Sequence, residues 1–321
     1  MNLLKYNKKY AFNAFGLRRI GPTCYFNTFL QAILSCPSIV ETFLTKSKSY
    51  PFNQSNVAQL LCNLMKNGMK IENSGNTKVL LNNHILFVQM IKSLGTKTFG
   101  IGQEDFDEAL HMFLSSLEAN FNTNITQFQE VENLLLHRRQ TNILCHECQK
   151  WISTTKEENI ILYVEPTLEV KQLDKFKSID KNYGKSLPLN EFLCKYTGFV
   201  DSNFKCTNKK CQKRGEKYKE SKLTMVPEVL IVVSKKFNNN NQKVKYLTPF
   251  PEKLTFTAKN KKDKLIYEAV AQVEHRGNTK GGHYFAICKR KNGWYVLNDT
   301  LVTPGKFKPT AETYAVLYHI V

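Results

Sequence analysis

The stretch from Gly16 to Pro37 reads GLRRIGPTCYFNTFLQAILSCP, and the rest of the chain is organised around it. It begins as a loop, because glycine and proline interrupt it before Thr23, a residue that suits the N-cap position of a helix. After Cys24 the apolar residues recur at the spacing of one helical face, at Phe26, Phe29, Leu30, Ile33 and Leu34, which leaves the polar residues Asn27, Thr28 and Gln31 on the other face. The sequence therefore predicts a buried helix with a cysteine in its first turn.

Cys24 has two interpretations. As a lone cysteine it would be a small, inert core residue. As a thiol at a helix start it lies near unpaired backbone N–H groups and the positive end of the helix dipole, which stabilise the thiolate. The same N–H groups could hold an oxyanion, so the environment of Cys24 would suit a nucleophile.

A second group of polar residues lies near the other end of the chain. His283 opens a strand-like run, and a turn near Gly293 reverses the chain into a second strand that ends at Asn298 and Asp299. This hairpin returns a carboxamide or a carboxylate to within a few residues of His283. A histidine beside a strand can also be structural, as we expect for His275. Nucleophile, base and orienter require this geometry and no fixed order in the sequence.

Two cysteine pairs suggest a metal site. Cys145 and Cys148 have the spacing with which one tight turn presents two thiolates to a tetrahedral ion. Cys206 and Cys211 form a second, wider pair beyond strand-like sequence. We expect the four thiolates to bind a structural zinc ion, with free thiols as the alternative and with His146 as a bystander.

An acidic cluster opens another predicted helix, between Gly102 and Leu117. Four carboxylates lie in its first turns: Glu104, Asp105, Asp107 and Glu108. They would complement the helix dipole, and in a basic chain they would also suit a cationic ligand.

The composition sets broad limits on function. The chain has 321 residues with 46 basic and 27 acidic ones, a formal net charge of +19. The basic residues are spread among many asparagines without a nucleic-acid motif, so we do not expect a nucleic-acid partner. The N-terminus lacks the apolar run of a signal peptide, and no stretch has the length of a membrane span. We therefore expect an intracellular protein, in the cytoplasm or the nucleus, whose nine cysteines are reduced.

Taken together, these motifs resemble those of the ubiquitin-specific proteases, and the resemblance spans nearly the whole chain. The cysteine box fits at Gly16, Leu17, Gly21, Thr23, Cys24, Tyr25, Asn27, Leu30 and Gln31. The histidine box fits at Gly282, His283, Tyr284, Trp294, Tyr295, Asn298, Asp299 and Val302. The acidic helix resembles the Gln-Gln-Asp box at Gln103, Asp105, Glu108 and Leu110.

The resemblance implies an α+β, papain-like cysteine protease fold with a helical thumb, a β-sheet palm and zinc-binding β fingers. Residues 1–15 would be an N-terminal extension, with the thumb at about 16–135, the fingers at about 140–225 and the palm at about 226–321. The implied activity is thiol-dependent hydrolysis of isopeptide or peptide bonds at the C-terminal glycine of ubiquitin, by a monomer that needs no cofactor for catalysis.

The resemblance also assigns roles to residues. Cys24 would be the nucleophile, His283 the base, and Asn298 or Asp299 the orienter of the imidazole. Asp105 and Glu108 would contact the arginine-rich tail of ubiquitin.

One position departs from the family. An asparagine five residues before the nucleophile commonly helps to hold the oxyanion there, and this chain has Arg19 in an oxyanion region completed by Thr23. A weakly active or inactive ubiquitin-binding protein is therefore one alternative to the expected deubiquitinase. A protease for another ubiquitin-like modifier is a second alternative.

Overall fold

The computed structural model describes most of the chain. The described residues are 8–46, 57–71, 84–85, 88–89, 104–120, 125–164, 195–237, 242–243, 247–257, 264–278 and 281–321. Gln103, which the sequence assigned to the acidic box, lies outside these residues.

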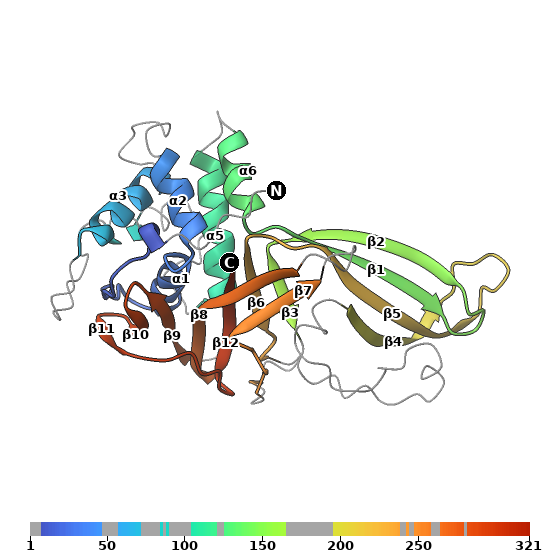
Figure 1. The fold of residues 1–321 in the computed structure, drawn as a ribbon. Coiled ribbons are helices and arrows are strands. Elements are labelled where there is room, and N and C mark those ends of the chain that lie inside the picture. Colours follow the sequence, from blue (N-terminus) through green and yellow to red (C-terminus); the bar gives the residue numbers. More distant parts are fainter. Residues whose placement is uncertain are drawn as a thin grey trace.

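The described helices gather in one lobe (Figure 1). They are the short 3-10 helix η1 (Lys8–Tyr10) and the α-helices α1 (Cys24–Ile33), α2 (Pro37–Lys46), α3 (Val57–Met69), α5 (Phe106–Asn120) and α6 (Ile125–Asn133). The ring of Phe29 on α1 lies 5.4 Å from that of Phe113 and 6.0 Å from that of Phe106, both on α5. The start of α2 at Pro37 is favourable, because the first turn of a helix needs no N–H from that residue. Aromatic packing thus fixes the cysteine helix within the helical lobe.

A large β-sheet lies against these helices (Figure 1). Its strands run in the order β11-β10-β9-β8-β12-β6-β3, with β7 paired to β8. They are β3 (Ile161–Val164), β6 (Val229–Ser234), β7 (Lys253–Thr257), β8 (Lys264–Asn278), β9 (Gly281–Arg290), β10 (Gly293–Asn298), β11 (Leu301–Pro304) and β12 (Thr313–Ile320). Every residue of β6 and β12 is buried, which explains why both read as continuous apolar runs rather than as an alternating pattern. The main core, which includes Val229, Ile231 and Val233, therefore lies between this sheet and the helices, and a second cluster, which includes Leu230 and Val232, packs on the other face of the sheet.

A smaller antiparallel sheet projects away from the helices (Figure 1). Its order is β2-β1-β5-β4, and its strands are β1 (His137–Cys145), β2 (Trp151–Asn159), β4 (Lys195–Lys205) and β5 (Arg214–Met225). Strand β3 leaves this region and pairs in parallel with β6 of the large sheet. Residues 161–164 thus belong to the large sheet although they fall inside the range predicted for the fingers, and the predicted division of the chain stays a prediction.

Helix α1 is buried on all sides. All ten of its residues are buried, including the three polar ones that the periodicity placed on a separate face. The amide of Gln31 donates to the carbonyl of Phe15 at 2.8 Å and accepts from the guanidinium of Arg290 at 2.6 Å. Buried polar groups are stable when they are paired in this way. The polar face therefore binds α1 to its surroundings instead of facing solvent.

Among the described residues, no single helix is long and apolar enough to cross a membrane. Helix α1 and residues Pro37–Thr45 of α2 pass that test of length and composition only as a pair, and they meet at a bend of 83°.

Candidate active site

Cys24 is the first residue of α1 and is fully buried. Thr23 is at the predicted N-cap position, but its side chain makes no capping bond to the helix. Its hydroxyl instead accepts a hydrogen bond from the N–H of Ile20 at 3.1 Å, which shapes the loop before the helix. The thiol therefore lies at a helix start where the Thr23 side chain leaves the first-turn N–H groups to other acceptors.

His283 lies on the hairpin that the sequence predicted. Strands β9 and β10 pair with Leu297 opposite Ala286, and this register brings Asn298 Oδ1 to 2.6 Å from His283 Nε2. An amide oxygen only accepts hydrogen bonds, so this contact places the imidazole proton on Nε2. Nδ1 then carries a lone pair and can accept a proton from a thiol. Helix α1 packs against both strands, so one scaffold carries the cysteine and the histidine.

Asp299 has a different partner. Its Oδ1 accepts a hydrogen bond from Asn27 Nδ2 on α1 at 2.7 Å, and its backbone carbonyl accepts from the N–H of Leu17 at 2.8 Å. The backbone of Asp299 has a φ of 51°, which is uncommon outside glycine but is tolerated by aspartate. The sequence did not decide whether Asn298 or Asp299 orients the imidazole. The structure places Asn298 against the imidazole and Asp299 against the cysteine helix.

The network behind the site contains residues that the sequence did not single out. His84 is fully buried, and its Nε2 lies 2.8 Å from Asn27 Oδ1. Burial lowers the pKa of His84 to about 4, so the ring is neutral at physiological pH. Asn27 appeared in the sequence only as a matching motif position, and nothing local to His84 indicated a partner 57 residues away.

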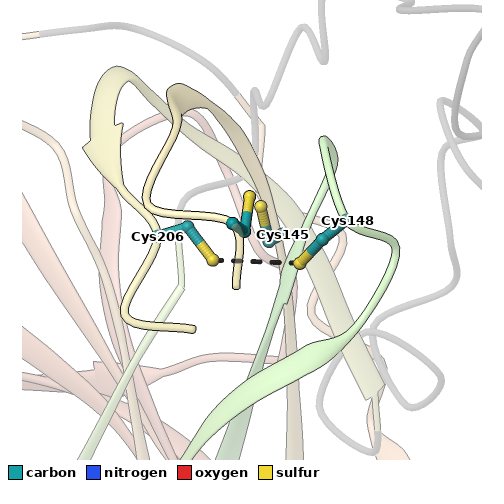
Figure 2. Close-up of side chains that lie close together, drawn as sticks. Cys145, Cys148 and Cys206 are labelled. Atoms are coloured by element: carbon teal, nitrogen blue, oxygen red, sulfur yellow. Dashed lines mark hydrogen bonds between the residues drawn. The ribbon is translucent and has the colours of Figure 1, made fainter. Parts of the chain in front are cut away.

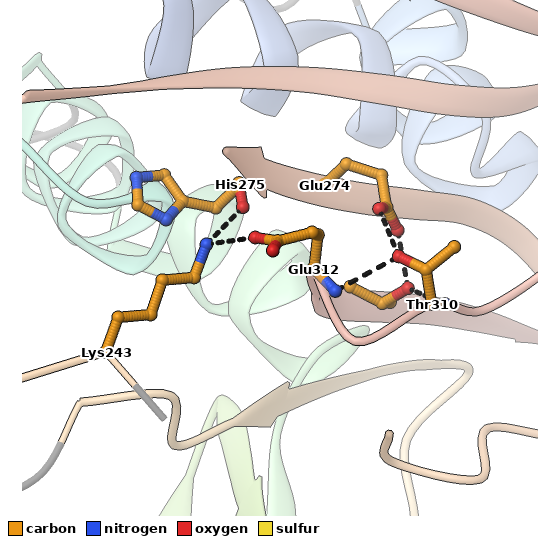
Figure 3. A network of polar contacts seen from close by, with 6 residues as sticks. Lys243, Glu274, His275, Thr310 and Glu312 are labelled. Atoms are coloured by element: carbon orange, nitrogen blue, oxygen red, sulfur yellow. Dashed lines mark hydrogen bonds and ion pairs between the residues drawn. The ribbon is translucent and has the colours of Figure 1, made fainter. Parts of the chain in front are cut away.

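A further histidine, His275, lies on β8, which pairs with the strand that carries His283, and Figure 3 shows its contact with Lys243. Its backbone carbonyl accepts a hydrogen bond from Lys243 Nζ, which also pairs with Glu312. Burial, followed by the charge of Lys243, lowers the pKa of His275 to about 4. A Cβ on Gly282 would lie 2.2 Å from His275 Nε2, so only glycine fits beside this ring. His275 is thus a neutral, buried side chain packed against the residue that precedes His283.

The acidic cluster anchors helix α5 to the large sheet. The hydroxyl of Tyr284, next to His283, donates to Asp105 Oδ1 at 2.8 Å. Asp105 is partly exposed, but burial of its carboxylate raises the pKa of that group. The hydrogen bond from Tyr284 opposes this shift. Asp107, which the sequence did not select, accepts hydrogen bonds from Tyr163 at 2.8 Å and Tyr314 at 3.0 Å. These two tyrosines also line an open cavity of about 140 Å³.

Two other expected site residues are exposed. Glu108 lies on the surface of the first turn of α5. The Arg19 side chain is turned to its own loop, where Nε donates to the carbonyl of Gly21 at 2.8 Å. Its guanidinium is therefore partly committed to holding the loop that precedes Cys24.

The four predicted zinc ligands come together where the loop between β1 and β2 meets the loop between β4 and β5, and Figure 2 shows Cys145, Cys148 and Cys206 of this cluster. All four sulfur atoms lie within 4.8 Å of one another, and the sulfurs of Cys148 and Cys206 are 3.8 Å apart. Zinc–sulfur bonds of about 2.3 Å in a tetrahedron separate the sulfurs by about 3.8 Å, so the cluster fits a zinc ion. Gln149 and Gln212, which follow the second cysteine of each pair, both have a positive φ that reverses the chain there.

Cys24 is buried at the start of a helix, and that helix packs against strands that carry an imidazole–carboxamide pair. This arrangement is typical of the cysteine-type hydrolases. A family model described as "Ubiquitin carboxyl-terminal hydrolase" matches residues 15–318, and the chain belongs to that family.

Named relatives agree with this assignment. Ubiquitin carboxyl-terminal hydrolase 8 of Saccharomyces cerevisiae is 22% identical over 90% of this chain, which spans 66% of that protein. Ubiquitin carboxyl-terminal hydrolase 5 of the same organism is 24% identical over 94% of this chain, which spans 44% of it. Ubiquitin carboxyl-terminal hydrolase 42 of Homo sapiens is 23% identical over 99% of this chain, which spans 23% of it. The chain thus corresponds to only part of each of these proteins.

Solved structures show the same fold. A SAGA DUB module of Ubp8, Sgf11, Sus1 and Sgf73 bound to monoubiquitin contains a chain with a TM-score of 0.74 and 20% identity; 98% of this chain and 70% of that chain are covered. The module bound to ubiquitin aldehyde gives a TM-score of 0.72 with 19% identity, covering 98% and 71%. The predicted α+β fold of the ubiquitin-specific protease type is thereby confirmed.

Proposed function

We propose that this chain is a thiol-dependent deubiquitinase that hydrolyses isopeptide and peptide bonds at the C-terminal glycine of ubiquitin. The observation that carries the proposal is the 2.6 Å contact between His283 Nε2 and Asn298 Oδ1, on a hairpin packed against the helix that begins at Cys24. Membership of the family supports ubiquitin as the substrate, and the structural relatives were solved with monoubiquitin and ubiquitin aldehyde.

In the proposed reaction, Cys24 Sγ attacks the carbonyl carbon of the terminal glycine while His283 Nδ1 accepts the thiol proton. N–H groups at the start of α1, in the region of Thr23, donate hydrogen bonds to the oxyanion that forms. The carbon–nitrogen bond then breaks, and His283 returns the proton to the leaving amine. Water attacks the thioester, with His283 again transferring the proton, and releases the ubiquitin carboxylate and the free thiol.

The acidic end of α5 is the proposed contact for the arginine-bearing tail of ubiquitin. Asp105 and Glu108 are exposed residues, although Asp105 also accepts a hydrogen bond from Tyr284, whereas Asp107 accepts hydrogen bonds from two tyrosines. The negative charges of these carboxylates repel one another at the N-terminus of the helix. A bound guanidinium would relieve that repulsion.

Zinc is the proposed structural metal, bound by Cys145, Cys148, Cys206 and Cys211. It would cross-link the loop between β1 and β2 to the loop between β4 and β5, as one tetrahedral ion does in other structural sites. The proposed catalytic steps do not pass through this ion. We further propose a monomer that acts inside the cell, in the cytoplasm or the nucleus, where free thiols persist.

The test is reaction of the chain with ubiquitin that carries a C-terminal electrophile. We expect wild-type protein to form a covalent adduct and Cys24→Ala to form none while still binding ubiquitin. Cys62→Ala is a matched control, because burial raises the pKa of that thiol to about 12 and it lies in the helical core. Labelling that survives in Cys24→Ala and is lost in another cysteine variant would disprove the assignment. If only probes built on other ubiquitin-like modifiers label the chain, its substrate is one of those modifiers and not ubiquitin.

A further inference from the structure

We infer that His84 is a positioning residue, which holds the cysteine helix and the Asn298–Asp299 turn in register through the side chain of Asn27. This inference rests on the proposed hydrolase function and adds a residue to it. His84 lies outside both motifs that identify the site.

The hydrogen-bond partners of Asn27 fix the orientation of its side-chain amide. Its nitrogen lies 2.7 Å from Asp299 Oδ1 and 3.5 Å from the carbonyl of Leu17, and both of these partners are acceptors. A flipped amide would direct an oxygen at a carboxylate and a carbonyl, so the nitrogen must face them. The amide oxygen therefore faces His84.

The partner of His84 determines which of its ring nitrogens carries the proton. Because Asn27 Oδ1 is an acceptor, His84 Nε2 must donate across the 2.8 Å that separates them. The ring is therefore the neutral tautomer with its proton on Nε2. Both side chains are buried, so water does not readily replace a lost donor.

The bond from His84 to Asn27 also affects the residues of the proposed active site. A donor on the amide oxygen polarises the amide, which strengthens the N–H bond from Asn27 to Asp299. That bond and the bond from the Leu17 N–H hold Asp299 at its positive φ, directly after Asn298. A residue in this conformation persists when its surroundings determine it. Asn27 is also one helical turn beyond Cys24, so the same clamp aligns the thiol with the hairpin.

The test compares His84→Leu, which removes the donor, with His84→Gln, whose amide nitrogen can donate from a similar position. On a ubiquitin C-terminal fluorogenic substrate, we expect His84→Leu to lower kcat by about tenfold or more with little change in KM, because one buried hydrogen bond is lost. We expect His84→Gln to recover most of kcat. His137→Leu is the matched control, since His137 is also buried and burial also lowers its pKa to about 4.

A second measurement does not depend on activity. The N–H of Leu17 donates to Asp299, so its hydrogen exchange reports on the clamp. We expect faster exchange at Leu17 in His84→Leu but not in His137→Leu. Unchanged exchange together with unchanged kcat would overturn the inference, as would equal kcat losses in the leucine and glutamine variants. If the wild-type chain cleaves no ubiquitin substrate, the proposed function fails and the exchange result alone decides the role of His84.

Discussion

Removal of the Asn298 side chain tests the base of the proposed mechanism directly. Asn298→Ala deletes the oxygen that lies 2.6 Å from His283 Nε2 and leaves the imidazole free to rotate or to change its tautomer. This hydrogen bond is only partly buried, so we expect a loss below the upper end of the range of about 1–3 kcal/mol for a fully buried bond, which corresponds to about 5- to 150-fold in kcat. Asn298→Asp keeps an acceptor at the same place and is expected to retain activity.

Asp299→Ala is expected to behave differently. It removes the charge-assisted bond to Asn27 and places alanine at a φ of 51°, where an ordinary residue costs about 1–2 kcal/mol. We therefore expect a lower melting temperature as well as a lower kcat, whereas Asn298→Ala should affect kcat alone. The double variant should lose less than the product of the two single losses, because Asn298 contacts the imidazole and Asp299, bonded to Asn27, acts on the imidazole only through the position of Asn298.

The assay is steady-state hydrolysis of a ubiquitin C-terminal fluorogenic substrate, combined with thermal unfolding of each variant. If Asn298→Ala and Asp299→Ala both turn over like the wild type, neither residue orients His283. The hairpin would then have no part in holding the base, and the reasoning from its register would be wrong.

Three further changes have expected outcomes. Cys206→Ser should lower both the zinc content, measured by elemental analysis as about one zinc per chain in the wild type, and the melting temperature, because a four-thiolate site loses a ligand. Wild-type protein that is prepared without chelator and contains no zinc would contradict this. Arg19→Asn should raise kcat by up to about 100-fold, since it supplies the oxyanion donor common in the family; an unchanged or lower kcat would show that Arg19 is no impediment. Gly282→Ala should lower both kcat and melting temperature, because its Cβ would lie 2.2 Å from the His275 ring, whereas Gly281→Ala has open space and should behave like the wild type; equal effects would exclude this packing as the cause.

Local sequence patterns predicted the parts of the site that local structure forms. The helix that begins at Cys24 follows from its apolar spacing, and the hairpin from His283 to Asn298 follows from two strand-like runs joined by a turn. The spacing of the cysteines also predicted that the four thiols would cluster, since each cysteine pair lies in a single turn.

The remaining contacts join residues far apart in the chain, and no periodicity reports on them. Asn27 and Asp299 are 272 positions apart, and Asp107 meets tyrosines from two separate strands. Periodicity also placed Asn27 and Gln31 on a polar face, which the structure buries because strands and loops supply partners for both. Sequence motifs predicted the proposed reacting groups, but only the tertiary structure shows which side chains surround them.

The position of β12 has a consequence for the order in which the protein folds. This strand lies in the sheet between β6 and β8, where Val316 is opposite both Val232 and Gln272. Until β12 inserts, β6, which is wholly buried in the folded protein, and β8, which is partly buried, have no partner on the edges that it later covers, and closing the intervening loops costs entropy. A chain in which β12 has not yet paired therefore exposes sheet edges to other chains. A substitution at Val316 should therefore reduce the yield of folded protein by favouring aggregation, while the molecules that do fold retain a complete site.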